Sequence, residues 1–199
     1  MVDSSAAAHW DEGMLIPVAE INELMLDLLR TLACGQGPGL PRLVGELRPL
    51  WHDIDDAALQ RLARCPYLLL DAGFASPEHW QRRALDGTVN DGAMPRGYFA
   101  STAGIALVRH ALVLARYLAR SHRLTARVLL GLAPECAERI ASRSLKDLEA
   151  LAELCPPWIA PRWEAQPAVW QQMLQAAREG PETLRRVQTR GLQLMAALW

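Results

Sequence analysis

Lysine, paired cysteines and long hydrophobic runs are all scarce or absent in this sequence. Only Lys146 among the 21 basic residues is a lysine, and the formal net charge of −1 gives no overall attraction to nucleic acid or to a membrane surface. No uncharged apolar run approaches the roughly 18 residues of a membrane span. Because Met1–Trp10 also lacks the basic start and apolar core of a secretory signal, we expect a cytoplasmic protein without a membrane segment.

Metal-binding and catalytic motifs are missing as well. The four cysteines are scattered without a Cys-x-x-Cys pair, so we expect reduced, mostly buried thiols rather than a zinc site. The glycine-rich segment Gly35–Gly39 has neither the Lys-Ser/Thr nor the preceding strand of a phosphate-binding loop. Ser101–Gly104 is not a nucleophile elbow, and no histidine is spaced toward a nucleophile. We therefore predict a non-enzymatic protein with no cofactor, no metal site and no small-molecule substrate.

One cluster, His52 with Asp53, Asp55 and Asp56, contains residue types that bind metals. These carboxylates also stand where a helix is expected to begin. A carboxylate at that position accepts hydrogen bonds from backbone N–H groups and interacts favourably with the helix dipole. We predict that this cluster caps a helix.

Apolar residues recur with the three- and four-residue spacing of helices, and no stretch shows the sustained alternation of a strand. The two longest patterns cover Val18–Leu32 and Ser101–Leu130. The second has Leu124 and Val128 on its apolar side and an interruption near Ser121-His122. Prolines and glycines divide the rest into short segments. We expect one short helix at Pro41–Leu50 and another capped by Ser144, with Asp147 three positions on, close to a capping box. We predict an all-α fold of about nine helices.

A segment of the chain occurs twice. Three apolar residues return 89 positions later, Leu59, Leu62 and Ala63 as Leu148, Leu151 and Ala152. After one inserted residue the offset becomes 90, and Cys65, Pro66, Pro77 and Trp80 return as Cys155, Pro156, Pro167 and Trp170. Self-similarity at a fixed offset is typical of repeated structural units. We predict two tandem helical repeats packed into one globule, residues 1–90 with a loose N-terminal tail and residues 91–199 with a C-terminal helix.

The C-terminal helix, which we expect to begin at Gly180-Pro181, has an apolar seam. Its members are Leu184, Val187, Leu194, Met195 and Leu198. The seam either closes this chain's own core or docks on a second copy or a partner.

A longer pattern, L-G-[LI]-x-x-E-x-A-x-x-[IL]-A-x-x-[ST]-L-x-x-L-x-x-L-A-E, lies within residues 127–162. It consists of Leu130, Gly131, Leu132, Glu135, Ala137, Ile140, Ala141, Ser144, Leu145, Leu148, Leu151, Ala152 and Glu153. This segment resembles the FlhD subunit of bacterial flagellar master transcription regulators. The resemblance implies an all-helical regulator subunit that self-associates, pairs with a zinc-bearing FlhC-type partner and binds promoter DNA as that complex. The chain departs from the family in its length and in its apparent doubling. The acidic balance of Ser144–Leu154 also argues against direct DNA contact by that helix.

Arginines are concentrated in an acid-free span from Gly92 to Pro134. On one continuous helix, their spacing would place five guanidinium groups on a single stripe, those of Arg109, Arg116, Arg120, Arg123 and Arg127. Neighbouring like charges repel by a few tenths of a kcal/mol per pair, so an acidic counterpart is expected. The counterpart is either nucleic-acid phosphate, an acidic partner protein, or the carboxylates of Glu20, Glu23 and Asp27 in this chain. The repeat matches Arg109 and Arg116 with Glu20 and Asp27, so we expect the first two arginines to be structural and the last three to be exposed.

Four of the seven tryptophans fall into two groups. Trp80 and Trp170 recur with the repeat, which indicates a packing role. Trp158 and Trp163 lie in a proline-rich turn and are candidates for exposed interface anchors. Together with the resemblance, the sequence predicts a helical regulatory protein resembling FlhD-type subunits that acts through a protein partner, with DNA as a further candidate ligand. The alternative is a helical adaptor or chaperone-like interaction module with no nucleic-acid role.

Overall fold

The computed structural model describes residues 12–35, 40–81 and 98–197, and these residues confirm the all-α prediction. They form eleven α-helices, one short 3-10 helix and one two-stranded sheet, where the sequence predicted about nine helices and no strand. In chain order the elements are η1 (Glu12–Met14), α1 (Leu15–Cys34), α2 (Arg42–Glu46), α3 (Arg48–Asp53), α4 (Asp56–Ala63), β1 (Leu70–Ala72), α5 (Pro77–Gln81), α6 (Thr102–Ser121), α7 (Arg123–Leu130), α8 (Pro134–Ser142), α9 (Leu145–Leu154), β2 (Ile159–Pro161), α10 (Pro167–Glu179) and α11 (Pro181–Ala196). Residues 1–11 of the predicted N-terminal tail and the predicted boundary between residues 90 and 91 lie outside the described residues.

Two of the predicted helices are each divided in the structure. The pattern Ser101–Leu130 forms α6 and then α7, because His122 leaves helical geometry with φ −143° and ψ 63°. The segment Pro41–Leu50 belongs to α2 and α3, which are divided at Leu47. These divisions account for part of the larger number of helices.

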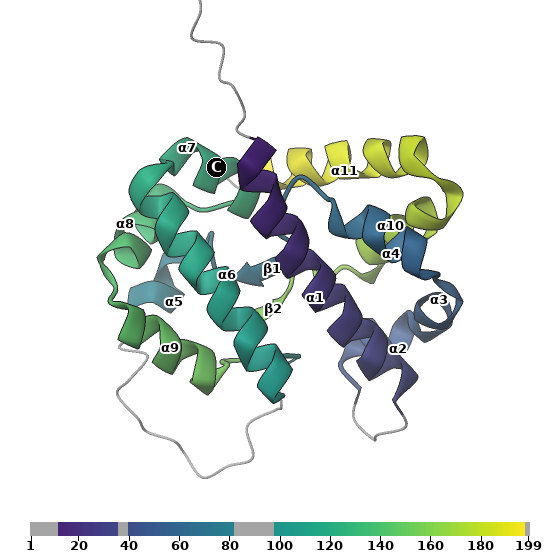
Figure 1. The fold of residues 1–199 in the computed structure, drawn as a ribbon, viewed down its shortest axis with the longest axis horizontal. Coiled ribbons are helices and arrows are strands. Elements are labelled where there is room, and N and C mark those ends of the chain that lie inside the picture. The colour runs from purple at the N-terminus through teal and green to yellow at the C-terminus, as the bar shows by residue number, and fades with distance from the viewer. Residues whose placement is uncertain (1–11, 36–39, 82–97, 198–199) are drawn as a thin grey trace, which may run out of the picture.

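The two 20-residue helices α1 and α6 lie side by side across one face of the molecule (Figure 1). α3 and α4 pack against α1, and α8 and α9 pack against α6. The buried side chain of Asn22 in α1 donates to the carbonyl oxygens of Ala63 (3.1 Å) and Tyr67 (3.0 Å). The side-chain amide oxygen of Asn22 accepts a hydrogen bond from the backbone N–H of Leu69 (2.8 Å). α1 therefore fixes the segment that leads from α4 into β1.

The strands β1 and β2 join the two halves of the chain at the centre of the molecule (Figure 1). They are antiparallel, and their middle residues, Asp71 and Ala160, lie opposite each other. At the offset of 90 predicted for this part of the repeat, Leu70 corresponds to Ala160 and Asp71 to Pro161. Asp71 therefore pairs with the equivalent of Leu70, and Leu70 pairs with the equivalent of Asp71. A two-fold axis between two copies of one strand produces such a register.

Each half of the chain places its tryptophan-bearing helix on the other half. α5 follows β1 and packs against α8, whereas α10 follows β2 and packs against α3 and α4 (Figure 1). The two indoles are held alike, since Trp80 Nε1 donates to the carbonyl of Gly73 (2.9 Å) and Trp170 Nε1 donates to that of Arg162 (2.6 Å). Both tryptophans are buried, which confirms their predicted packing role.

Burial recurs between the halves, but at two different offsets. The buried Leu59, Leu62 and Ala63 of α4 recur in α9 at the predicted offset of 89. The buried residues of α1 recur in α6 only 86 positions later, where Val18, Ile21, Asn22, Met25, Leu26, Leu29 and Ala33 are matched by Gly104, Leu107, Val108, Ala111, Leu112, Ala115 and Ala119. A tandem duplication would produce these features, and the duplication itself stays a prediction.

One hydrophobic cluster contains residues of both halves, so the two halves share a core. The buried Arg162 connects three segments of the chain within this core. Its guanidinium group donates to the backbone carbonyls of Leu68 (2.9 Å) and Leu130 (2.8 Å), and its backbone N–H donates to that of Leu69 (2.7 Å). Hydrogen bonds from a charged donor are stronger than neutral ones, which makes this side chain a strong tie between the halves.

The C-terminal helix α11 lies along one edge of the molecule (Figure 1). Leu184 and Met195 of its apolar seam are buried in the shared core, and Val187 and Leu194 are half-buried. This burial supports the first of the two predicted roles, in which the seam closes the chain's own core. Leu198 lies outside the described residues.

By length and composition α6 could cross a membrane, and among the described residues it is the one helix that meets this criterion. Half of the apolar window is buried inside the fold, where α6 packs against α1, α8 and α9. A buried core helix meets the same criterion, so the predicted absence of a membrane segment stays a prediction.

Candidate interaction surfaces

The five arginines of the acid-free span lie on two helices. α6 ends at Ser121, so Arg109, Arg116 and Arg120 belong to α6, whereas Arg123 and Arg127 belong to α7. The single stripe expected on a continuous helix is therefore wrong. The physical reason is local, because the backbone at His122 is not helical and α7 starts a new helix after it.

Arg109 and Arg116 are half-buried and make contacts within the chain, but not with the partners that the repeat suggested. An Nη atom of Arg109 lies 3.9 Å from a carboxylate oxygen of Glu153, and its Nε atom is buried without a hydrogen-bond partner. The Nε of Arg116 donates to the backbone carbonyl of Arg143 (2.7 Å). Within the described ranges, neither arginine forms an ion pair with a carboxylate of α1.

The buried faces of α1 and α6 also contradict the match that the repeat suggested. The buried faces of α1 and α6 coincide at an offset of 86, which matches Arg109 with Glu23 and Arg116 with Arg30. The offset of 89, taken from the later part of the repeat, does not apply to these two helices. The predicted match of Arg109 and Arg116 with Glu20 and Asp27 therefore fails.

α7 exposes apolar side chains together with arginines. Leu124 is 79% exposed and Val128 is 37% exposed, although the sequence pattern placed both on the apolar side of one long helix. After the break at His122, the face of α7 that turns inward consists of Ala126, Leu129 and Leu130. Arg123 and Arg127 are exposed on the same side of α7 as the two apolar residues.

The last turn of α6 extends this exposed face. The ring of Tyr117 is 48% exposed and lies 5.7 Å, centroid to centroid, from that of His122. Arg120 is exposed as well, and neither its side chain nor that of Arg123 has a partner among the described residues. We call the whole area the basic–apolar surface, and it consists of Tyr117, Arg120, Arg123, Leu124, Arg127 and Val128.

A groove of opposite charge runs between α1 and α4. Its larger part has a volume of about 480 Å³ and is lined by Leu15, Ile16, Ala19, Glu20, Glu23, Gln60, Ala63 and Arg64. An adjoining hollow of about 230 Å³ is lined by Glu23, Leu26, Asp27, Arg30, Asp56, Leu59 and Gln60. We call the two together the α1–α4 groove. Ile16 is 60% exposed at one end of this groove.

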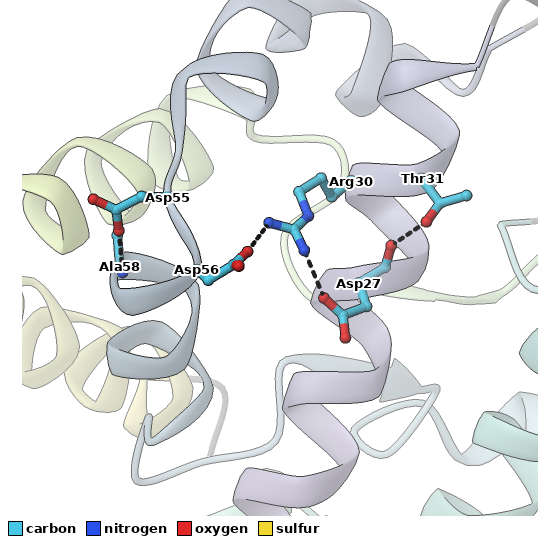
Figure 2. Close-up of polar contacts among 6 residues, drawn as sticks. All are labelled: Asp27, Arg30, Thr31, Asp55, Asp56 and Ala58. Carbon is cyan, nitrogen blue, oxygen red and sulfur yellow. Dashed lines mark hydrogen bonds and ion pairs between the residues drawn. The ribbon is translucent and has the colours of Figure 1, made fainter.

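The carboxylates of the groove differ in whether they are paired. Arg30 lies between Asp27 and Asp56, with its Nη1 atom 2.5 Å from Asp56 Oδ1 and its Nη2 atom 3.4 Å from Asp27 Oδ1 (Figure 2). The hydrogen bond to Asp56 raises the pKa of Arg30 above its ordinary value. Glu20 and Glu23 are exposed and, in the part of the chain that the structure describes, their carboxylates have no ion-pair partner. The unpaired negative charge of the groove is therefore at these two residues.

Asp55 and Asp56 of the acidic cluster begin α4, which confirms the predicted capping, whereas His52 and Asp53 are the last residues of α3. The Oδ1 atom of Asp55 accepts a hydrogen bond from the N–H of Ala58 (2.6 Å), and Asp56 is bonded to Arg30 (Figure 2). Across residues 12–35, 40–81 and 98–197, no group of three His, Cys, Asp or Glu side chains is arranged to hold a metal ion. All four thiols are free, and burial raises the pKa of Cys65 to about 12.

Trp158 and Trp163, the predicted interface anchors, are half-buried against this chain. The Trp158 ring stacks on His79 with centroids 4.8 Å apart and meets Trp80 edge-on. The Trp163 ring meets Tyr67 edge-on at 5.7 Å. These contacts leave only part of each ring for a partner.

Comparisons of the chain with protein-family models, curated proteins and solved structures found no match. The two surfaces must therefore be interpreted from their own chemistry. Sequence reasoning named the arginines but missed the apolar half of their surface and missed the groove entirely. The apolar half of the arginine surface could have been found from the spacing of Leu124 and Val128 relative to a helix break at His122. The groove combines side chains from α1 and α4, whose juxtaposition no local pattern reveals.

Proposed function

We propose that this protein is a non-enzymatic helical regulatory subunit that binds a protein partner through its basic–apolar surface. The observation that carries the proposal is the 79% exposure of Leu124, which follows Arg120 and Arg123, two arginines whose side chains lack partners among the described residues. Burying such a leucine in an interface contributes about 1.5–3 kcal/mol. The neighbouring guanidinium groups would orient and attract an acidic partner.

The resemblance to FlhD-type subunits supports a regulatory role for this binding. The resembling segment folds as the end of α7 followed by α8 and α9, and Ile140 and Leu148 of its pattern are buried. Ser144 and Asp147 form a capping box at the start of α9. Most matched positions are core or capping residues, so the pattern specifies how these helices fold and does not itself specify a binding site. An FlhC-type subunit or a second copy of the chain is accordingly a proposed partner.

A second candidate ligand is nucleic acid, because Arg120 and Arg123 have the geometry to bind phosphate oxygens bidentately. The apolar residues argue for protein instead. Leu124 and Val128 gain nothing from phosphate groups, whereas a protein surface can cover them. The adaptor or chaperone-like alternative uses the same surface and differs only in having no role in gene regulation.

Site-specific photo-crosslinking in cells tests the proposal. A photoreactive residue at position 124 is expected to crosslink to a defined protein, whereas the same residue at position 154 is not. Leu154 is a matched control because it is 51% exposed on α9, outside the basic–apolar surface. Substituting both Arg120 and Arg123 with Glu should abolish the crosslink at position 124. Equal crosslinking at both positions, or crosslinks to nucleic acid alone, would contradict the proposal.

A further inference from the structure

We infer that the basic–apolar surface binds the α1–α4 groove of a second copy of this chain. This inference rests on the proposed function, because it names the partner of the same surface. The two surfaces have opposite unpaired charge, and both expose apolar side chains. Within one molecule neither surface is covered by the other, so the contact would join two molecules.

Charge is the first complementary property. The basic–apolar surface contributes Arg120 and Arg123, whose guanidinium groups have no partner among the described residues. The groove contributes the carboxylates of Glu20 and Glu23, which are exposed and also lack ion-pair partners there. Arg64, at the α4 side of the groove, is the one lining cation not engaged by Asp27 or Asp56. The arginines therefore approach best along α1, away from α4.

The order of residues along the helices is the second complementary property. In the groove, the apolar Leu15 and Ile16 come first along α1, and the carboxylates follow one and two turns later. On the other surface Arg123 is the first residue of α7, Leu124 follows it, and Arg127 and Val128 come one turn later. An antiparallel approach of α7 to α1 consequently places Leu124 and Val128 toward Leu15 and Ile16, and Arg123 toward the carboxylates. Leu124 and Val128 are one turn apart, about 6 Å along the helix, which matches the spacing of successive turns of α1.

The full-length chain tests this inference by sedimentation velocity over a concentration series. The wild-type protein is expected to associate reversibly and to dissociate as salt screens the exposed charges. Leu124→Glu, which disables the surface, and Ile16→Glu, which disables the groove, should each weaken self-association roughly tenfold or more. An equimolar mixture of the two variants should form a heterodimer, because one variant keeps an intact groove and the other keeps an intact surface.

A charge reversal provides a second measurement of the same contact. Arg123→Glu should weaken association, and adding Glu23→Arg to that variant should restore part of it. Leu154→Glu is the matched control, since it places the same charge on an exposed leucine outside both surfaces, and it should leave association unchanged. Circular dichroism of every variant excludes loss of folding as the cause.

The outcomes separate this inference from the proposed function. If the wild type is monomeric at all concentrations, or if the mixture of Leu124→Glu and Ile16→Glu stays monomeric, the inference is overturned. A crosslink from position 124 to a different protein would then leave the proposed function standing without a second copy as the partner. Absence of any specific protein crosslink at that position would reject the proposed function as well.

Discussion

Leu148 and Leu151 of α9 face the shared core and are 1% and 5% exposed, whereas Lys146 on the same helix is exposed. Replacing Leu151 by Ala removes buried methyl groups and leaves a cavity, so we expect the free energy of unfolding to fall by about 2–5 kcal/mol. Lys146→Ala should change it by less than roughly 0.5 kcal/mol. Urea denaturation of both variants measures the difference. Equal stability of Leu151→Ala and the wild type would show that this helix face is not packed.

Replacing Gly191 of α11 with alanine should lower the stability of the protein, which is opposite to the usual effect of this substitution in a helix. Alanine normally stabilises the interior of a helix by about 1 kcal/mol relative to glycine. At Gly191 an added Cβ would overlap the hydroxyl group of the buried Tyr67 and lie 3.1 Å from the ring of Trp163. We therefore expect Gly191→Ala to destabilise the protein by about 1–3 kcal/mol through overpacking.

The matched control for this prediction is Gly45→Ala in α2. There the nearest side-chain atom to the added Cβ would be that of Leu40, at 3.9 Å. This substitution should be neutral or stabilising by up to about 1 kcal/mol. Thermal unfolding of the two variants compares them directly. A stabilised Gly191→Ala variant would show that α11 does not pack closely on Tyr67.

Burial of single residues could be predicted where the sequence is apolar and periodic, as for Leu148, Leu151 and the two recurring tryptophans. It could not be predicted for Arg162, which is 4% exposed and bonded to backbone carbonyls. Arginine is rarely buried. Its binding groups here are carbonyls of residues 68 and 130, which only the tertiary fold brings to its side chain.

Among the elements, helix starts were more predictable than helix breaks. Asp55 and Ser144 cap α4 and α9 as the sequence predicted, because capping depends on a side chain and the next three residues. The break at His122 has no proline or glycine nearby to set its place, and the sequence signalled only an interruption. The strands β1 and β2 are three residues long, too short to show alternation. Their formation depends on the pairing of distant segments.

The capping box of α9 makes a prediction about pH. Hydrogen bonds from the side chain and the backbone N–H of Ser144 stabilise the ionised carboxylate of Asp147 and lower its pKa from the ordinary value. Because the pKa is lowered on folding, the contribution to stability is present above the ordinary carboxyl pKa and is lost as pH falls through the lowered value. NMR titration should give a low pKa for Asp147 in the wild type and a higher one in Ser144→Ala. An unchanged pKa in that variant would contradict the capping box.

For the molecule as a whole, DNA titration at several salt concentrations distinguishes the two candidate ligands. We expect the wild type and a variant with both Arg120→Gln and Arg123→Gln to bind duplex DNA equally weakly, because the proposed ligand of these arginines is a protein. Phosphate contacts would give a different result. The slope of log affinity against log salt would then fall by about one for each lost contact, uniformly across DNA sequences. Fluorescence anisotropy measures this slope.

The exchange of α5 and α10 between the halves has a consequence for the protein while it is being made. Trp51 of α3 packs against Trp170 of α10, with ring centroids 6.0 Å apart. On the ribosome, α3 and α4 emerge long before α10 does. At about 5–20 residues per second, the roughly 100 residues between them take about 5–20 s to translate. During that interval the nascent chain has an incomplete core around Trp51, and it becomes fully packed only when nearly the whole chain has been synthesised.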